Sequence, residues 1–143
     1  MTVSVVMPTF NRVDLVQDAI DSVLFQGRVN VEVVVVDDGS TDGTGEVLRT
    51  RYGDRIHYCH QSNRGRSAAR NLGIQVSSGR YLLFLDSDDL LLPGGLAAES
   101  NFLDAHPEVD VVYTDGYFCD ADGRELARFA PARPSHDPAN LLK

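Results

Sequence analysis

Short apolar runs alternate with helical patterns along most of the chain. Residues 3–7 and 31–36 are runs rich in valine, which is typical of strands that are covered on both faces of a sheet. Between them, residues 13–26 carry apolar pairs about every four positions, which is the spacing of an amphipathic helix. The first third of the sequence therefore predicts a strand, a helix and a second strand.

The same alternation continues beyond residue 40. We expect helices over 41–52, 67–76 and about 95–106, and strands over 56–61, 81–85 and 109–113, with Ser40 and Thr41 as N-caps of the first of these helices. Two last strands, 117–119 and 125–129, flank Asp122-Gly123, a strong hairpin turn signal. This order predicts an α/β fold with a mostly parallel sheet, helices on both faces and a C-terminal β-hairpin. Residues 129–143 contain three prolines and are expected to be an extended tail.

Polar residues lie next to the predicted strand ends. Ligands of parallel sheets bind beyond the carboxyl ends of the strands. The segments to consider are 8–12, 37–40, 63–71 and 86–89.

Asp86-Ser87-Asp88-Asp89 places three carboxylates within four residues, directly after an apolar strand. Ionised carboxylates this close repel one another, and a divalent cation relieves that repulsion. Hard oxygen ligands suit Mg²⁺ or Mn²⁺, which proteins commonly share with substrate phosphates. The alternative is a helix start that is rich in acids because of the helix dipole.

Asp37 and Asp38 end another strand, before Gly39 and Ser40. A strand-to-helix turn accounts for the glycine and the serine, but it does not require two adjacent aspartates. One of them is suited to accept hydrogen bonds from a nucleobase or a ribose hydroxyl. The spacing leaves a structural and a binding role equally open.

The composition narrows the class of ligand. Thirteen basic against 21 acidic residues give a net charge of −8, which argues against sequence-independent nucleic-acid binding. Arg64, Arg66 and Arg70 supply local positive charge that suits phosphate, although a solvated helix face is the alternative. The only lysine is Lys143, which excludes a phosphate-binding loop of the G-x-x-x-x-G-K type.

The two cysteines and the absence of a long apolar run predict a cytoplasmic protein without a membrane segment.

Taken together, these segments resemble the N-terminal nucleotide-sugar-binding portion of a family 2 glycosyltransferase of the GT-A type. The resemblance covers about residues 3–115. It rests on four motifs in register, which are Val5 to Arg12, Val33 to Asp42, Asn63 to Gly73, and Gly79 to Asp89 with Pro93.

The resemblance implies a role for each matching residue. Phe10 would lie against the base, Asp38 would bind it, Arg70 would lie near the base or the diphosphate, and Asp86 would approach the ribose. Asp88, with Asp86, would hold Mn²⁺ or Mg²⁺. The implied nucleotide-sugar-binding residues are Pro8, Thr9, Phe10, Arg12, Asp38, Arg70, Asp86, Ser87 and Asp88.

The implied reaction is transfer of a sugar, with inversion, from a nucleotide donor (a UDP-sugar in the first instance) to a hydroxyl of a glycan, lipid or other acceptor. Such enzymes belong to cell-wall or polysaccharide biosynthesis. No residue matches the general base of the family. We therefore expect residues 1–115 to form the donor-binding core and 116–143 to begin an acceptor-binding region that this chain lacks.

Two other functions stay open on the residues alone. One is a non-catalytic module that binds nucleotide sugars, and the other is a different metal-dependent enzyme that acts on phosphates. Because a shortened sheet exposes apolar surface, we also expect self-association of the chain.

Overall fold

The computed structural model describes residues 2–27, 29–120 and 123–129. The chain divides into two compact units, Met1–Asn101 and Phe102–Lys143, which are described separately. The elements in chain order are β1 (Thr2–Thr9), α1 (Val13–Leu24), β2 (Asn30–Asp37), α2 (Thr44–Tyr52), the short 3-10 helix η1 (Gly53–Arg55), β3 (His57–His60), α3 (Arg66–Val76), β4 (Tyr81–Phe84), α4 (Gly95–Ala105), β5 (Gly116–Cys119) and β6 (Glu125–Phe129).

The first unit is built on a four-stranded parallel sheet with the strand order β3-β2-β1-β4. The two valine-rich strands lie in its centre, as their continuous apolar patterns predict. Thr9 at the end of β1 is in register with Asp37 at the end of β2, so the carboxyl ends of the central strands meet at one edge.

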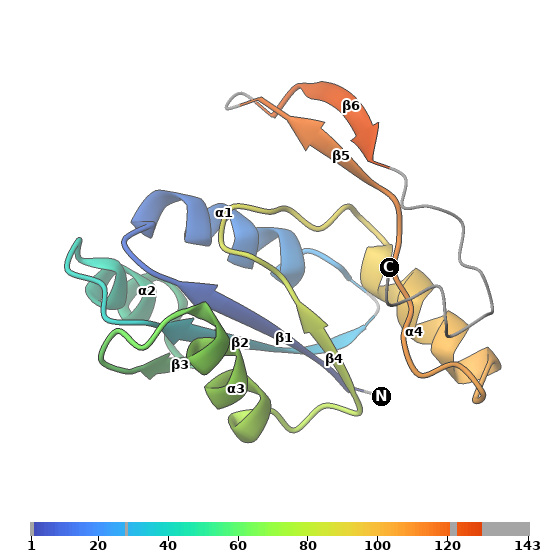
Figure 1. Cartoon of the computed structure of the whole chain (residues 1–143), viewed down its shortest axis with the longest axis horizontal. Coiled ribbons are helices and arrows are strands. Elements are labelled where there is room, and N and C mark those ends of the chain that lie inside the picture. Colours follow the sequence, from blue (N-terminus) through green and yellow to red (C-terminus); the bar gives the residue numbers. More distant parts are fainter. Residues whose placement is uncertain (1, 28, 121–122, 130–143) are drawn as a thin grey trace. The chain divides into compact units, whose positions relative to one another are not determined.

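Helices cover both faces of this sheet, and Figure 1 shows α1 and α3 on opposite sides of it. On one face, β1 and β2 pack against α1, α2 and the start of α4 through Val5, Met7, Val33, Val35, Ile20, Leu48 and Leu96. On the other face, the alternate residues Val6, Val34 and Val36 pack against Ala69 and Leu72 of α3. The predicted α/β architecture is thus confirmed.

Helix α3 approaches the sheet very closely at Gly73. A Cβ atom built there would lie 2.3 Å from Cγ1 of Val6 on β1. Real carbon atoms do not come so close, so only glycine allows the α3 backbone to rest on β1.

The predicted hairpin is confirmed in the second unit. Strands β5 and β6 are antiparallel, and the rings of Phe118 and Phe129 meet edge to face with their centroids 5.9 Å apart. Arg128 forms an ion pair with Asp115. Asp122 of the predicted turn and the expected tail from residue 130 lie outside the described residues.

The strand predicted over 109–113 is wrong. In the described part of the chain this segment has no strand partner, and Val111 is 76% exposed. Its apolar residues follow a strand pattern, but a strand also needs a ladder of hydrogen bonds with a neighbouring strand.

The N-caps predicted for α2 are also wrong. The helix begins at Thr44, after Gly43, which has the left-handed φ of 88°. Asp42 accepts a hydrogen bond from the Thr44 N–H at 3.1 Å. Ser40 and Thr41 instead bond to the loop that follows β1, which changes their role from helix starts to links between two loops.

The described helices include none that is both long and apolar enough to cross a membrane.

The outer strand β4 leaves Leu82 and Phe84 more than two-fifths exposed. The expected self-association stays a prediction.

Candidate functional site

A pocket of about 280 Å³ lies beyond the carboxyl ends of the central strands. It is contained within the first unit. Its lining comes from the end of β1, the loops after β1, β2, β3 and β4, and the first residue of α3. The lining residues are Pro8, Thr9, Phe10, Arg12, Asp38, Asn63, Gly65, Arg66, Asp86, Ser87 and Asp88. Every predicted site residue except Arg70 is among them.

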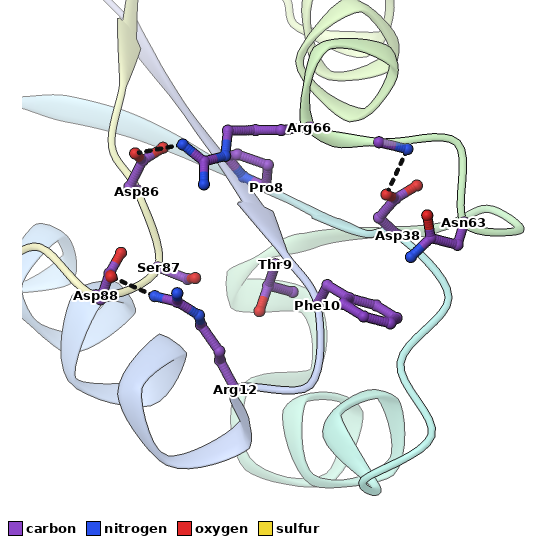
Figure 2. A pocket seen from close by; sticks show the side chains of 11 residues that line it. Pro8, Thr9, Phe10, Arg12, Asp38, Asn63, Arg66, Asp86, Ser87 and Asp88 are labelled. Carbon is purple, nitrogen blue, oxygen red and sulfur yellow. Dashed lines mark hydrogen bonds and ion pairs between the residues drawn. The ribbon is translucent and has the colours of Figure 1, made fainter.

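The pocket has two chemically different ends, which Figure 2 shows. The Phe10 ring lies with Asp38 and Asn63 at one end, whereas Asp86 and Asp88 lie at the other. Phe10 is 45% exposed although it is aromatic. One end is therefore suited to a flat ring, and the other holds the strong charges.

The loop after β1 is held in place by the loop after β2. Asn11, which has a φ of 51°, accepts a hydrogen bond from the Thr41 N–H at 2.8 Å and donates its own N–H to Ser40 Oγ at 2.9 Å. The Val13 N–H donates to Asp42 Oδ2 at 3.1 Å. These bonds fix the backbone of the two pocket residues that flank Asn11.

Asp37 has a structural role. Its carboxylate is buried, accepts the Ser40 N–H at 2.8 Å, and accepts the Tyr58 hydroxyl at 2.6 Å. Burial and the hydrogen bond to Asp37 raise the pKa of Tyr58 above its ordinary value. This aspartate fixes the turn after β2 and is absent from the pocket lining.

Asp38 holds the loop that follows β3. It accepts the side-chain amide of Gln61 at 2.6 Å and the backbone N–H groups of Arg64 at 2.9 Å and Gly65 at 2.8 Å. Burial by itself raises the pKa of Asp38, but these three hydrogen bonds outweigh it, and the net pKa is lowered. The carboxylate thus stays ionised at the edge of the pocket, and its predicted contact with a base stays a prediction.

Gly39 allows that loop to come so close. Its φ is 88°, and a Cβ atom there would lie 2.9 Å from the backbone nitrogen of Asn63. A side chain would therefore both strain the turn and push the loop off Asp38.

Replacing Asp38 with asparagine should destabilise the protein at pH 7 by about 1–3 kcal/mol, because the new amide faces N–H groups that lose an acceptor. Since the folded pKa of Asp38 is lowered, its contribution is complete above the unfolded value of 3.8 and is lost as the pH falls through the folded pKa. Urea unfolding should show that the free energy of unfolding is lower for the variant than for the unaltered protein, and that this difference disappears as the pH falls below about 4.

The exposed Asp54 supplies the matched control, because Asp54→Asn removes the same charge outside the pocket. An equal loss of unfolding free energy in Asp54→Asn would contradict the anchoring role of Asp38. So would a loss in Asp38→Asn that persists in acid.

Arginines already neutralise both carboxylates at the charged end. Asp86 accepts Arg70 at 2.6 Å and has Arg66 at 3.8 Å, and Asp88 forms an ion pair with Arg12 (Figure 2 draws the Arg66 and Arg12 pairs). The hydrogen bond from Arg12 lowers the pKa of Asp88 against the effect of burial. Burial, together with the charges of Asp88 and Asp86, raises the pKa of Asp89.

Arg70 reaches the pocket only through Asp86, because it is absent from the lining. Asn63, Gly65 and Arg66 line the pocket but are not among the predicted nucleotide-sugar-binding residues, although Arg66 is one of the three arginines whose charge suits phosphate. Their position in the sequence could have indicated them, because all three lie in the segment 63–71, which follows a predicted strand end. From this segment, the resemblance implies a role for Arg70 alone.

The charged end of the pocket is better suited to a cation that is held jointly by the protein and a bound phosphate than to a metal held by protein side chains alone. In the described ranges, no three His, Cys, Asp or Glu side chains form a group that could hold a metal. Asp86 and Asp88, each with one carboxylate, nevertheless both line the pocket. Mg²⁺ is commonly bound by one or two carboxylates plus substrate phosphates, so two carboxylates suffice when a phosphate completes the site.

Comparison with known proteins identifies relatives of this chain. A family model described as Glycosyl transferase family 2 matches residues 4–139. An uncharacterized glycosyltransferase of Rickettsia bellii is 40% identical over 83% of this chain and 18% of its own length. The putative teichuronic acid biosynthesis glycosyltransferase TuaG of Bacillus subtilis is 34% identical over 96% of this chain and 56% of its own. The chain therefore spans only part of these relatives.

Solved structures agree with this grouping. TarS 1-349 of S. aureus in complex with UDP has a TM-score of 0.63 and 30% identity over 75% of this chain and 33% of that chain. A mannosyltransferase of Pyrobaculum calidifontis in complex with GDP-Man and Mn²⁺ has a TM-score of 0.65 and 29% identity over 71% of this chain and 32% of that chain.

Proposed function

The chain belongs to glycosyl transferase family 2, and on that premise we propose that its pocket binds the nucleoside diphosphate of a sugar donor together with Mn²⁺ or Mg²⁺. The proposed reaction is transfer of the donor sugar to an acceptor hydroxyl with inversion. The relationship to TuaG supports a cell-wall or polysaccharide acceptor.

One observation carries the proposal, namely the separation of the two ends of the pocket. A nucleoside diphosphate has a flat base at one end and a strongly anionic group at the other. Phe10 and Asp38 offer a ring and a hydrogen-bond acceptor for the base, while Asp86, Asp88 and their arginines lie where the diphosphate would be. This order matches the ligand from base to phosphate.

Thr9 adds a polar group between these ends. The residue is only 3% exposed, and its Oγ1 has no hydrogen-bond partner in the described part of the structure. A buried hydroxyl without a partner costs free energy, and a ligand that enters the pocket is able to supply one. The unsatisfied hydroxyl thus supports a polar ligand.

The chemistry of the charged end follows from the leaving group. When the sugar is transferred, the bond from its anomeric carbon to the diphosphate breaks and negative charge grows on the phosphate oxygens. A bound divalent cation stabilises that charge. Asp86 and Asp88 would hold the cation, and the guanidinium of Arg66 would donate hydrogen bonds to the phosphates. We assign no general base to this chain.

Calorimetry of the chain with UDP tests the proposal directly. We expect binding with Mn²⁺ and little or none with EDTA, because the arginines beside Asp86 and Asp88 are already paired and leave little net positive charge for a diphosphate unless a cation is bound. GDP in place of UDP measures the preference for the base, since the solved relatives carry both UDP and GDP-Man.

Equal affinity with Mn²⁺ and with EDTA would contradict a shared cation. Absence of binding to any nucleoside diphosphate would contradict the donor site as a whole. Hydrolysis of simple phosphate esters that is lost in Asp86→Asn would favour the alternative of a different phosphate-handling enzyme.

A further inference from the structure

The two carboxylates at the charged end are neutralised in different ways. Arg70 holds Asp86 from outside the pocket lining, and both side chains are about one-third exposed. Arg12 holds Asp88 from within the lining, and these side chains are 40% and 47% exposed. The Arg12–Asp88 pair is thus the more accessible one, and an exposed ion pair contributes little to stability.

The backbone of Arg12 is fixed although its side chain is accessible. Its carbonyl accepts the first-turn N–H of Val16 in α1 at 3.0 Å. On either side, Asn11 bonds to Thr41 and Val13 bonds to Asp42. The guanidinium is therefore an accessible group on a fixed backbone, and changing its partner requires no movement of the loop.

A divalent cation competes with this arginine. The Asp88 carboxylate is a proposed cation ligand, and it already carries the Arg12 guanidinium. Two positive groups on one carboxylate repel each other, so a cation and the guanidinium would compete for it. A bound diphosphate, however, brings several negative oxygens into the same pocket, and guanidinium matches phosphate in charge and shape.

We propose that Arg12 exchanges partners during donor binding, pairing with Asp88 in the empty pocket and with the donor diphosphate when a divalent cation takes its place on Asp88. This inference rests on the proposed function. Arg12 thereby makes cation and donor binding cooperative, because the cation alone must displace the arginine and the donor gives the displaced arginine a new partner.

The variant Arg12→Gln tests the exchange by two opposite changes. Without nucleotide, the free-Mn²⁺ signal in electron paramagnetic resonance should show Mn²⁺ binding that is about two- to fivefold tighter, which is the value of an exposed ion pair. With saturating Mn²⁺, calorimetry should show UDP binding that is about tenfold weaker or more, which is the value of a charged hydrogen bond.

Two control variants separate this effect from general ones. Arg55→Gln removes the same charge from η1, which precedes β3 and lies outside the pocket lining, and should leave both affinities unchanged. Phe10→Ala should weaken UDP binding without tightening Mn²⁺ binding, because the ring lies at the opposite end of the pocket from Asp86 and Asp88.

The unaltered chain and the variant report on different claims. If the unaltered chain binds UDP with Mn²⁺ but Arg12→Gln leaves Mn²⁺ affinity unchanged or lower, the exchange is overturned while the donor site stands. Tighter Mn²⁺ binding with unchanged UDP affinity also overturns it, because Arg12 then has no second partner. If the unaltered chain binds no UDP, the proposed function fails and the inference fails with it.

Discussion

Asp88→Ala is expected to abolish the metal-dependent part of UDP binding. Substitutions that only support a metal ligand typically cost 10–100-fold in metal affinity, so loss of a ligand should cost at least about as much. Calorimetry of the variant with Mn²⁺ should give the weak affinity that the unaltered chain shows with EDTA. Folding should change little, because the described partner of this side chain is one accessible arginine.

Asp89→Ala provides the matched control. This neighbouring carboxylate belongs to the same acidic segment but is absent from the pocket lining. It should keep metal-dependent UDP binding close to that of the unaltered chain. If Asp88→Ala retains that binding, or if both variants lose it equally, Asp88 is not the cation ligand.

Gly73→Val is expected to cause the largest loss of stability. The Cβ position at Gly73 lies 2.3 Å from a methyl group of Val6, which is fully buried on the face of the sheet that α3 covers. Forcing extra carbon atoms into a packed core costs about 1–3 kcal/mol, and this contact places the variant at the upper end. Urea unfolding measures the loss, and Gln75→Val on the exposed side of α3 controls for valine in a helix.

A second substitution tests the stated cause. Val6→Ala removes the methyl group that clashes and destabilises the protein by itself through a cavity. If the clash is responsible, the double variant Val6→Ala/Gly73→Val should be more stable than the sum of the single effects predicts, by about 0.5–3 kcal/mol. Additive effects would show that Gly73 matters for another reason.

The parallel sheet followed directly from the sequence because its central strands are buried on both faces. A continuous valine run has few other stable solutions, and the amphipathic stripe of α1 identifies the layer that covers it. The segment 109–113 has similar letters but lies in the second unit without a strand partner in the described residues. Pairing is a property of two segments, so one apolar run does not determine it.

The site was predictable as a place but not as a set of contacts. The rule that ligands bind at the strand ends located the pocket, and the resemblance supplied most of its residues. The separate tasks of Asp37 and Asp38 depend on Tyr58, Gln61 and the loop after β3, which are remote in sequence. The pairing of Arg12 with Asp88 joins residues 76 positions apart for the same reason.

The two adjacent aspartates also penalise wrong alignments of β2. Asp37 bonds toward Tyr58, and Asp38 bonds toward the N–H groups of Arg64 and Gly65. A slip by one residue would reverse the facing of every side chain along the strand. A slip in one direction would present Gly39 to those N–H groups and leave them without an acceptor, whereas a slip in the other would put Val36 at the place of Asp37, opposite the Tyr58 hydroxyl. The valine run by itself would allow several alignments of β2, and the two aspartates favour one of them. Asp38, which helps to select this alignment, also borders the pocket.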